Sequence, residues 1–143
     1  MKIVCVDFNG VLDTYEGWRG PKHFDGARPG AREFLQALSS RGYAIVVFTT
    51  RYAADVWQWL RQHDLDDLVI DVTDRKPAAH VFVDDRAVCF RGDFAATLQE
   101  IDCFTAHWGE DGNYAEARDE GASSSTSVEQ SRAYSGHVRT SSS

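Results

Sequence analysis

The chain has 143 residues, 43% of them hydrophobic, which is enough for one domain with a sizeable core. Its formal net charge of −7 argues against bulk binding to a nucleic-acid backbone, and no apolar run approaches the roughly 18 residues that span a bilayer. Three cysteines without CxxC spacing, and a first segment without a signal-peptide pattern, favour a cytoplasmic protein with no membrane partner.

Apolar and amphipathic segments alternate over the first hundred residues. Residues 2–7 (KIVCVD) form an apolar run typical of a buried strand, and 29–42 carries a helical stripe that begins near Pro29 and ends at Gly42. The alternation then continues, and we expect strands at 44–49, 68–72 and 80–85, a short strand at 87–90, and helices at 54–64 and 93–104. Strands that alternate with helices predict right-handed crossovers and an α/β fold whose parallel sheet is covered on both faces.

Composition divides the chain into a domain over residues 1–108 and a tail over 109–143. The tail holds nine Ser and few large apolar residues. Such a segment cannot bury enough surface to offset the entropy of ordering it, so we predict that it is disordered. Its role is open between an inert appendage and a segment that binds a partner or regulates the domain.

The ends of the predicted strands collect chemically active side chains. In an open parallel sheet, ligands bind beyond the carboxyl ends of the strands. One strand ends at Asp7, the next at Thr49–Arg51 and the fourth at Asp84–Asp85, with Lys76 in the loop before it. Each of these alone has an ordinary explanation, such as a turn, a helix cap or β-propensity. Their joint occurrence at one sheet edge predicts a functional site.

This set of side chains suits phosphoryl chemistry. Mg²⁺ prefers hard oxygen ligands, which Asp7 and the pair Asp84–Asp85 would supply. A carboxylate can also act as a nucleophile and form an aspartyl phosphate. Lys76 and the cation would neutralise charge on the transferring group, and Thr49 would bind its oxygens. Arg51 would grip a phosphate or a carboxylate of the substrate in a bidentate manner.

The same segments resemble the four motifs of the haloacid dehalogenase superfamily of phosphatases and phosphotransferases, over residues 1 to about 108. The first motif, DxDGx(T/V), matches 7–10 except at Asn9. The other three are an apolar strand ending in Ser or Thr, a Lys often followed by Pro, and an apolar strand ending in two acids. They match 44–49, 76–77 and 81–85.

The resemblance implies a single Rossmann-like domain and a role for each matching residue. Asp7 would be the nucleophile and a Mg²⁺ ligand, together with the backbone carbonyl of Asn9 and the side chains of Asp84 and Asp85. The phosphoryl group would be held by Thr49, or by Thr50 if the strand ends one residue later, and by Lys76.

Asn9 departs from the family pattern. Phosphatases of the family use an Asp there to protonate the leaving group and then to activate water, and an amide can do neither. General acid–base catalysis contributes typically about 10²–10⁴-fold. Three explanations are open: a substrate whose leaving group needs little protonation, a degenerate protein kept for binding, or a deliberate Asp-to-Asn substitution.

Only residues 11–43 separate the first two motifs, which allows a short flap but no large cap domain. By resemblance, the chain belongs with capless members, whose open sites accept bulky substrates or are closed by a neighbouring subunit. Aromatic and basic side chains of the flap are candidates for holding a base, a sugar or a second anion: Trp18, Arg19, Lys22 and His23. Alternatively, Trp18 and Phe24 only pin the flap to the body. His23 is also a candidate replacement acid.

We therefore expect a Mg²⁺-dependent phosphohydrolase that acts through Asp7 on a phosphorylated small molecule or nucleotide-like substrate. The alternative is a catalytically silent protein of the same fold that binds a phosphate ligand or serves in assembly. A homo-oligomer is left open. Trp57 and Trp59, two residues apart, face different ways on their helix, so one is expected in the core and Trp59 is a candidate subunit contact.

Overall fold

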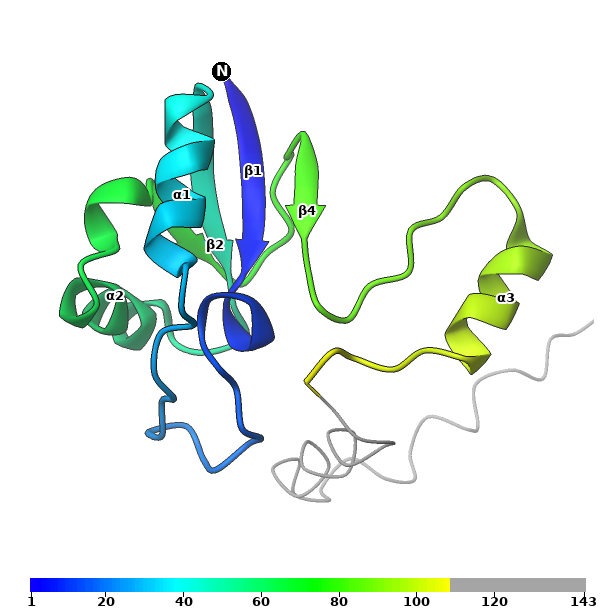
Figure 1. Cartoon of the computed structure of the whole chain (residues 1–143), viewed down its shortest axis with the longest axis horizontal. Coiled ribbons are helices and arrows are strands. Elements are labelled where there is room, and N and C mark those ends of the chain that lie inside the picture. The colour runs from blue at the N-terminus through cyan, green and yellow to red at the C-terminus, as the bar shows by residue number, and fades with distance from the viewer. Residues whose placement is uncertain (109–143) are drawn as a thin grey trace, which may run out of the picture.

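The computed structural model describes residues 1–108, so the predicted tail at 109–143 lies outside the described residues. The elements follow one another in this order: β1 (Lys2–Asp7), a helical turn (Phe8–Leu12), α1 (Ala31–Ser40), β2 (Tyr43–Phe48), α2 (Ala53–Gln62), a 3₁₀ turn (Asp66–Leu68), β3 (Asp71–Thr73), β4 (Val81–Val83) and α3 (Phe94–Asp102). Figure 1 shows their arrangement.

The four strands form one parallel sheet in the order β3-β2-β1-β4. In the register, Val4 of β1 lies beside Ile45 of β2 and beside Val81 of β4. This places β1 in the interior of the sheet, with a neighbour on each side. The structure thus confirms the predicted α/β fold with a parallel sheet.

The core lies on one face of the sheet, under α1 and α2. Alternate residues of β1 and β2 point to this face and pack against Leu35 of α1 and Leu60 of α2 in one buried cluster. Both helices place an apolar stripe on the sheet, as expected of amphipathic helices. No helix among residues 1–108 is long and apolar enough to cross a membrane.

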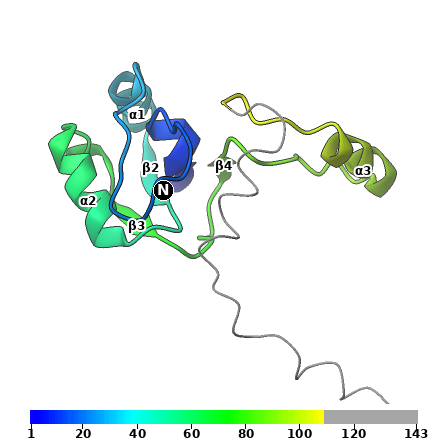
Figure 2. The same ribbon diagram turned by 90° about the horizontal axis from the view of Figure 1, so that it is seen from below.

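The expectation that helices cover both faces of the sheet is wrong for the described residues. α3 forms close to its predicted position, and Asp93 caps it by accepting hydrogen bonds from Ala95 N and Ala96 N at 2.9 and 3.2 Å. It nevertheless buries none of its residues and stands apart from the sheet in both views (Figures 1 and 2). The extended segment between β4 and α3 carries the helix away from the strands.

Three smaller expectations also differ from the structure. Residues 87–90 form no strand, because they pair with no neighbouring strand, and the third strand begins at Asp71 after a 3₁₀ turn. Trp59 is not a subunit contact: it is 2% exposed, packs edge-on against Phe8, and donates from Nε1 to the carbonyl of Asp25 at 2.8 Å. It therefore belongs to the core.

The segment between the helical turn and α1 forms the predicted short flap. Its two ends meet at an isolated antiparallel bridge between Asp13 and Ala27. Arg51, at the end of β2, holds the flap to the body. Its guanidinium lies 5.0 Å from the ring centre of Trp18 and 4.3 Å from that of Phe24, and Nη1 donates to the carbonyl of His23 at 2.8 Å.

Candidate active site

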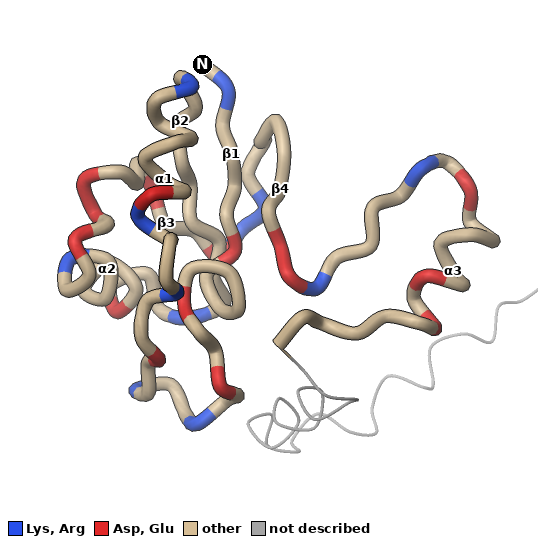
Figure 3. The backbone as a smooth tube through the Cα atoms, viewed as in Figure 1, with Lys and Arg blue, Asp and Glu red and all other residues tan. Residues whose placement is uncertain are grey.

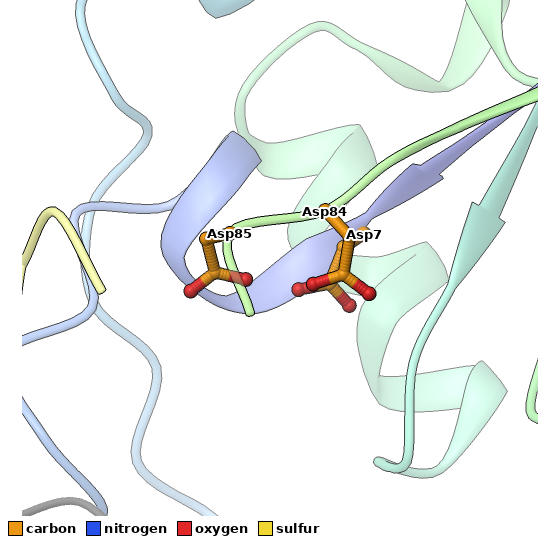
Figure 4. A group of neighbouring side chains, drawn as sticks. All are labelled: Asp7, Asp84 and Asp85. Carbon is orange, nitrogen blue, oxygen red and sulfur yellow. The ribbon is translucent and has the colours of Figure 1, made fainter. Parts of the chain in front are cut away.

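Three carboxylates meet where β1 and β4 end. Asp7 is the last residue of β1, and Asp84 and Asp85 follow β4 directly. One oxygen from each lies within 4.8 Å of the others. Figure 4 shows the three side chains drawn together at this sheet edge, and Figure 3 places the acidic residues there beside a basic one. The parallel pairing of β1 with β4 is what brings residues so distant in the chain together.

The cluster is electrostatically unfavourable without a cation. Burial, a hydrogen bond to Asp85 and the charge of Asp84 together raise the pKa of Asp7 from its usual 3.8 to about 8. The Oδ1 atom of Asp85 is buried and has no hydrogen-bond partner among the described residues. Three carboxylate oxygens lie this close together, and Oδ1 of Asp85 lacks a hydrogen-bond partner among the described residues. Such a set of hard oxygen ligands fits Mg²⁺.

The backbone at Gly10 is fitted closely around Asp85. Gly10 has φ +85°, and a Cβ at this position would collide with the carboxylate of Asp85. Its N–H donates to Oδ1 of the buried Asp13 at 2.7 Å, and its carbonyl accepts from Nε2 of His107 at 2.7 Å. The indole of Trp108 also donates to Oδ2 of Asp85. Residues from the two ends of the described chain thus fix one acid of the cluster.

Asn9 is held in a defined orientation by its neighbours. In the amide orientation that its two neighbours require, the nitrogen donates to Oδ2 of Asp13 at 2.9 Å, and the oxygen accepts from Nε of Arg51 at 3.2 Å. Asp13 is 1% exposed, and burial raises its pKa to about 6, against the lowering effect of the Gly10 N–H. For the cationic Arg51, burial has the opposite effect and lowers the pKa, while the charge of Asp13 acts to raise it. An amide at position 9 therefore satisfies an acceptor on one side and a donor on the other.

A polar cavity of about 330 Å³ opens beside the acids. It is lined by residues from three strand ends and the following loops: Asp7, Asn9, Phe48, Thr49, Thr50, Asp84 and Arg86. Thr49 is buried, and its Oγ1 accepts from the N–H of Arg51 at 3.0 Å, whereas Thr50 is exposed. The hydroxyl of Thr49 still carries a proton to donate into the cavity.

Lys76 lies outside this polar cavity. It lines a neighbouring cavity of about 700 Å³, together with Asp7 and Asp84, and its Nζ lies 4.8 Å from the ring centre of Phe82. The predicted phosphate-binding lysine therefore approaches the acids from the side of the apolar cavity.

The structure does not bring the flap residues into the polar cavity. Arg19 pairs with Glu16 at 3.7 Å, and Lys22 with Asp55 at 3.9 Å. His23 lies 3.0 Å from Asp25 and lines, with Lys22, a separate cavity of about 410 Å³. Arg51 and Trp18 are engaged with each other where the flap meets the body.

Sequence patterns missed several residues of the site. Arg86 lines the polar cavity, and its place directly after the acid pair was the signal that could have indicated it. Asp13 follows the first motif closely, but nothing in its spacing shows that it is buried against Asn9. The return of His107 and Trp108 to the site depends on the tertiary fold, and no local pattern predicts it.

The fold is similar to that of a conserved protein from Bacteroides thetaiotaomicron, with 21% sequence identity and a TM-score of 0.49 over 72% of this chain and 92% of that one. No family model matches the sequence. None of the curated proteins matches it either.

Proposed function

We propose that the protein is a Mg²⁺-dependent phosphohydrolase of the haloacid dehalogenase type, acting on a phosphate monoester or phosphoanhydride. The observation that carries this proposal is the group of three carboxylates from two adjacent strand ends, beside a polar cavity that is also lined by threonines. The order and spacing of the four sequence motifs support the same assignment. The three free cysteines favour a reducing compartment such as the cytoplasm.

Mg²⁺ would be held by Asp7, Asp84, Asp85 and the carbonyl of Asn9, and would supply charge neutralisation for the transferring phosphoryl group. Asp7, ionised, would attack phosphorus as a carboxylate nucleophile, and the P–O bond to the leaving group would break as the aspartyl phosphate forms. Water would then attack the same phosphorus, releasing phosphate and regenerating Asp7. The hydroxyls of Thr49 and Thr50 donate to phosphoryl oxygens.

The environment of Asn9 defines which substrates the site suits. Its amide is occupied by Asp13 and Arg51 and has no proton to give to a leaving group. The site is therefore suited to leaving groups that depart without protonation, such as those of acyl, anomeric or aryl phosphates. This restriction agrees with a specialised phosphatase better than with a general one.

Turnover tests this proposal directly. The protein is assayed with and without Mg²⁺ on an aryl phosphate, an acyl phosphate, and a panel of alkyl phosphates and nucleotides. We expect Mg²⁺-dependent hydrolysis of the substrates with good leaving groups, and its loss in Asp7→Ala. A matched control, Asp66→Ala, removes a carboxylate from the 3₁₀ turn and leaves the rate unchanged.

A second candidate function is phosphate-ligand binding without turnover, which the lack of an acidic proton at Asn9 also favours. The turnover assays, joined to calorimetric titrations with inorganic phosphate and the same phosphorylated compounds, separate the two. If no substrate is hydrolysed while a phosphorylated ligand still binds in the presence of Mg²⁺, the binding function replaces the enzymatic one.

A further inference from the structure

An arm, defined as residues 86–105 and carrying α3, projects from the body of the protein. Both of its ends lie at the candidate site. The first end follows Asp85 directly after β4, and just beyond the other end Trp108 donates to Asp85 and packs edge-on against Tyr15 at 4.7 Å, while His107 donates to the carbonyl of Gly10. Between these fixed ends the chain extends outward, and α3 stands clear of the sheet (Figures 1 and 2). The arm is thus anchored at its base, and no side chain of α3 is buried against the rest of residues 1–108.

The arm presents an apolar stripe that nothing in the described chain covers. Phe94, Leu98 and Ile101 recur at helical spacing along α3, and each is more than half exposed. Phe90, in the segment before the helix, stacks on Phe94 at 5.1 Å and extends the stripe. An exposed stripe of this kind marks an interaction surface more often than an isolated exposed residue does.

The body presents a matching apolar groove. The register places Phe82 of β4 beside Cys5 of β1 on the sheet face that carries neither α1 nor α2. On this face lies the cavity of about 700 Å³, lined by Cys5, Phe48, Phe82 and Val88 among others. Parallel sheets are normally covered by helices on both faces, whereas no helix within residues 1–108 packs on this face.

We propose that two copies of this chain exchange arms, so that α3 of each copy packs in the groove of the other. The contact is reciprocal, because each chain gives one α3 and receives the other. The result is a twofold-symmetric dimer in which both helices and both grooves are occupied. The base of the arm, held through Trp108, keeps its own α3 directed away from its own groove. The proposal does not depend on the phosphohydrolase function.

The exposed apolar area is large enough for such a dimer. Six side chains of the stripe and the groove are 40–78% exposed: Val81, Phe82, Phe90, Phe94, Leu98 and Ile101. At roughly 150–250 Å² for a whole aromatic side chain and somewhat less for an aliphatic one, their exposed parts amount to about 600 Å² per chain. Two chains would bury about 1,200 Å² from these side chains alone, which reaches the lower end of specific interfaces.

The first test is the mass of the full chain in solution over a wide concentration range, by light scattering after gel filtration. We expect a dimer. Leu98→Asp should raise its dissociation constant by at least about 100-fold, because each dimer loses two buried leucines. Gln99→Asp adds the same charge one residue further along α3, off the apolar stripe, and should leave the dimer intact. A chain that is monomeric throughout, or a dimer that Leu98→Asp does not weaken, overturns the proposal.

A cross-linking test shows which chain supplies the arm. In a background of Cys89→Ser and Cys103→Ser, one chain carries Phe82→Cys and the other, distinguished by a mass tag, carries Leu98→Cys. We expect a short bismaleimide to join tagged to untagged chains in the mixture. If instead a chain carrying both new cysteines is linked only within itself, α3 folds back on its own groove and the exchange is refuted.

Discussion

The amide nitrogen of Asn9 donates a hydrogen bond to Oδ2 of the buried Asp13 at 2.9 Å, while the amide oxygen accepts from Arg51. Position 9 therefore faces an acceptor that needs a donor. A carboxylate in its place would set two acids against each other in a buried environment. Asn9, the one place where the sequence differs from the haloacid dehalogenase motif that it resembles, thus has a structural partner in Asp13.

This pairing predicts that Asn9→Asp destabilises the protein at neutral pH by roughly 1–3 kcal/mol, because a buried hydrogen bond becomes a repulsive contact. The reciprocal double variant Asn9→Asp/Asp13→Asn restores one amide and one carboxylate, and should recover most of the loss. Urea denaturation of the two single variants and the double variant gives the coupling. Losses that simply add would show that the two side chains do not interact.

The same variant should depend on pH in a defined direction. The pKa of Asp13 is about 6, so below that pH Asp13 carries a proton that it can donate to the new carboxylate. The free-energy penalty of Asn9→Asp should therefore shrink as the pH falls from 8 to 5. Denaturation curves at both pH values measure this, with the unsubstituted chain as reference at each.

Metal binding should release a proton and strengthen as the pH rises. Without a cation the pKa of Asp7 is about 8 against its ordinary 3.8, so between these values the folded chain holds a proton that the unfolded chain has lost. Through this group, raising the pH destabilises the metal-free fold, and Mg²⁺ offsets that effect by taking the place of the proton. Affinity for Mg²⁺ should rise from pH 6 to pH 8 and level off above, as calorimetry in buffers of different ionisation enthalpy would detect.

The stabilisation by Mg²⁺ can be assigned to its ligands by thermal unfolding. At ten times its dissociation constant, Mg²⁺ should stabilise the fold by about 1.4 kcal/mol. Asp84→Asn or Asp85→Asn should remove most of this increment. Glu33→Gln changes an exposed acid of α1 in the same conservative way, and should keep it. An increment that survives in both Asp variants would place the cation elsewhere.

The close approach at Gly10 predicts a penalty that a matched glycine does not share. Gly10→Ala meets both the positive φ and the side chain of Asp85, whereas Gly17→Ala at φ +102° meets only the backbone strain, with nothing within 4 Å. We expect about 1–2 kcal/mol for Gly17→Ala and about 1–3 kcal/mol more for Gly10→Ala. Equal losses would mean that the contact with Asp85 carries no cost.

Cys5 should resist thiol reagents in the folded chain. It is 1% exposed, and burial, followed by the charges of Asp7 and Asp84, raises its pKa to about 11. Cys89 and Cys103 are exposed. A maleimide followed by mass spectrometry should label at most two cysteines in the native protein and all three in denaturant. Native labelling of Cys5 would contradict its burial.

Local patterns in the sequence were sufficient for most of the strands and helices, though not for the strand predicted at 87–90, and for the acids at the strand ends. Apolar runs such as Ile3–Val6 and the motif at Asp7 are local signals, which can be recognised without knowing the rest of the chain. The placement of α3 could not be predicted in this way. Its amphipathic pattern indicates that one face of the helix is to be covered, but it does not indicate which surface covers that face. The positions of Asp13 and Trp108 depend on contacts between distant segments, which no spacing in one sequence encodes.

The pairing of β1 with β4 also has a consequence for folding. It joins Val4 to Val81, whereas β1 and β2 are linked by a shorter crossover and share the core with α1 and α2. Contacts of such long sequence separation carry the largest loop-closure entropy and form late. Since Asp84 and Asp85 arrive with β4, a chain can complete its core and still lack two of its three acids. The cluster of acids is then completed after the core, so that binding of the proposed cation would report completion of the sheet edge and not collapse of the core.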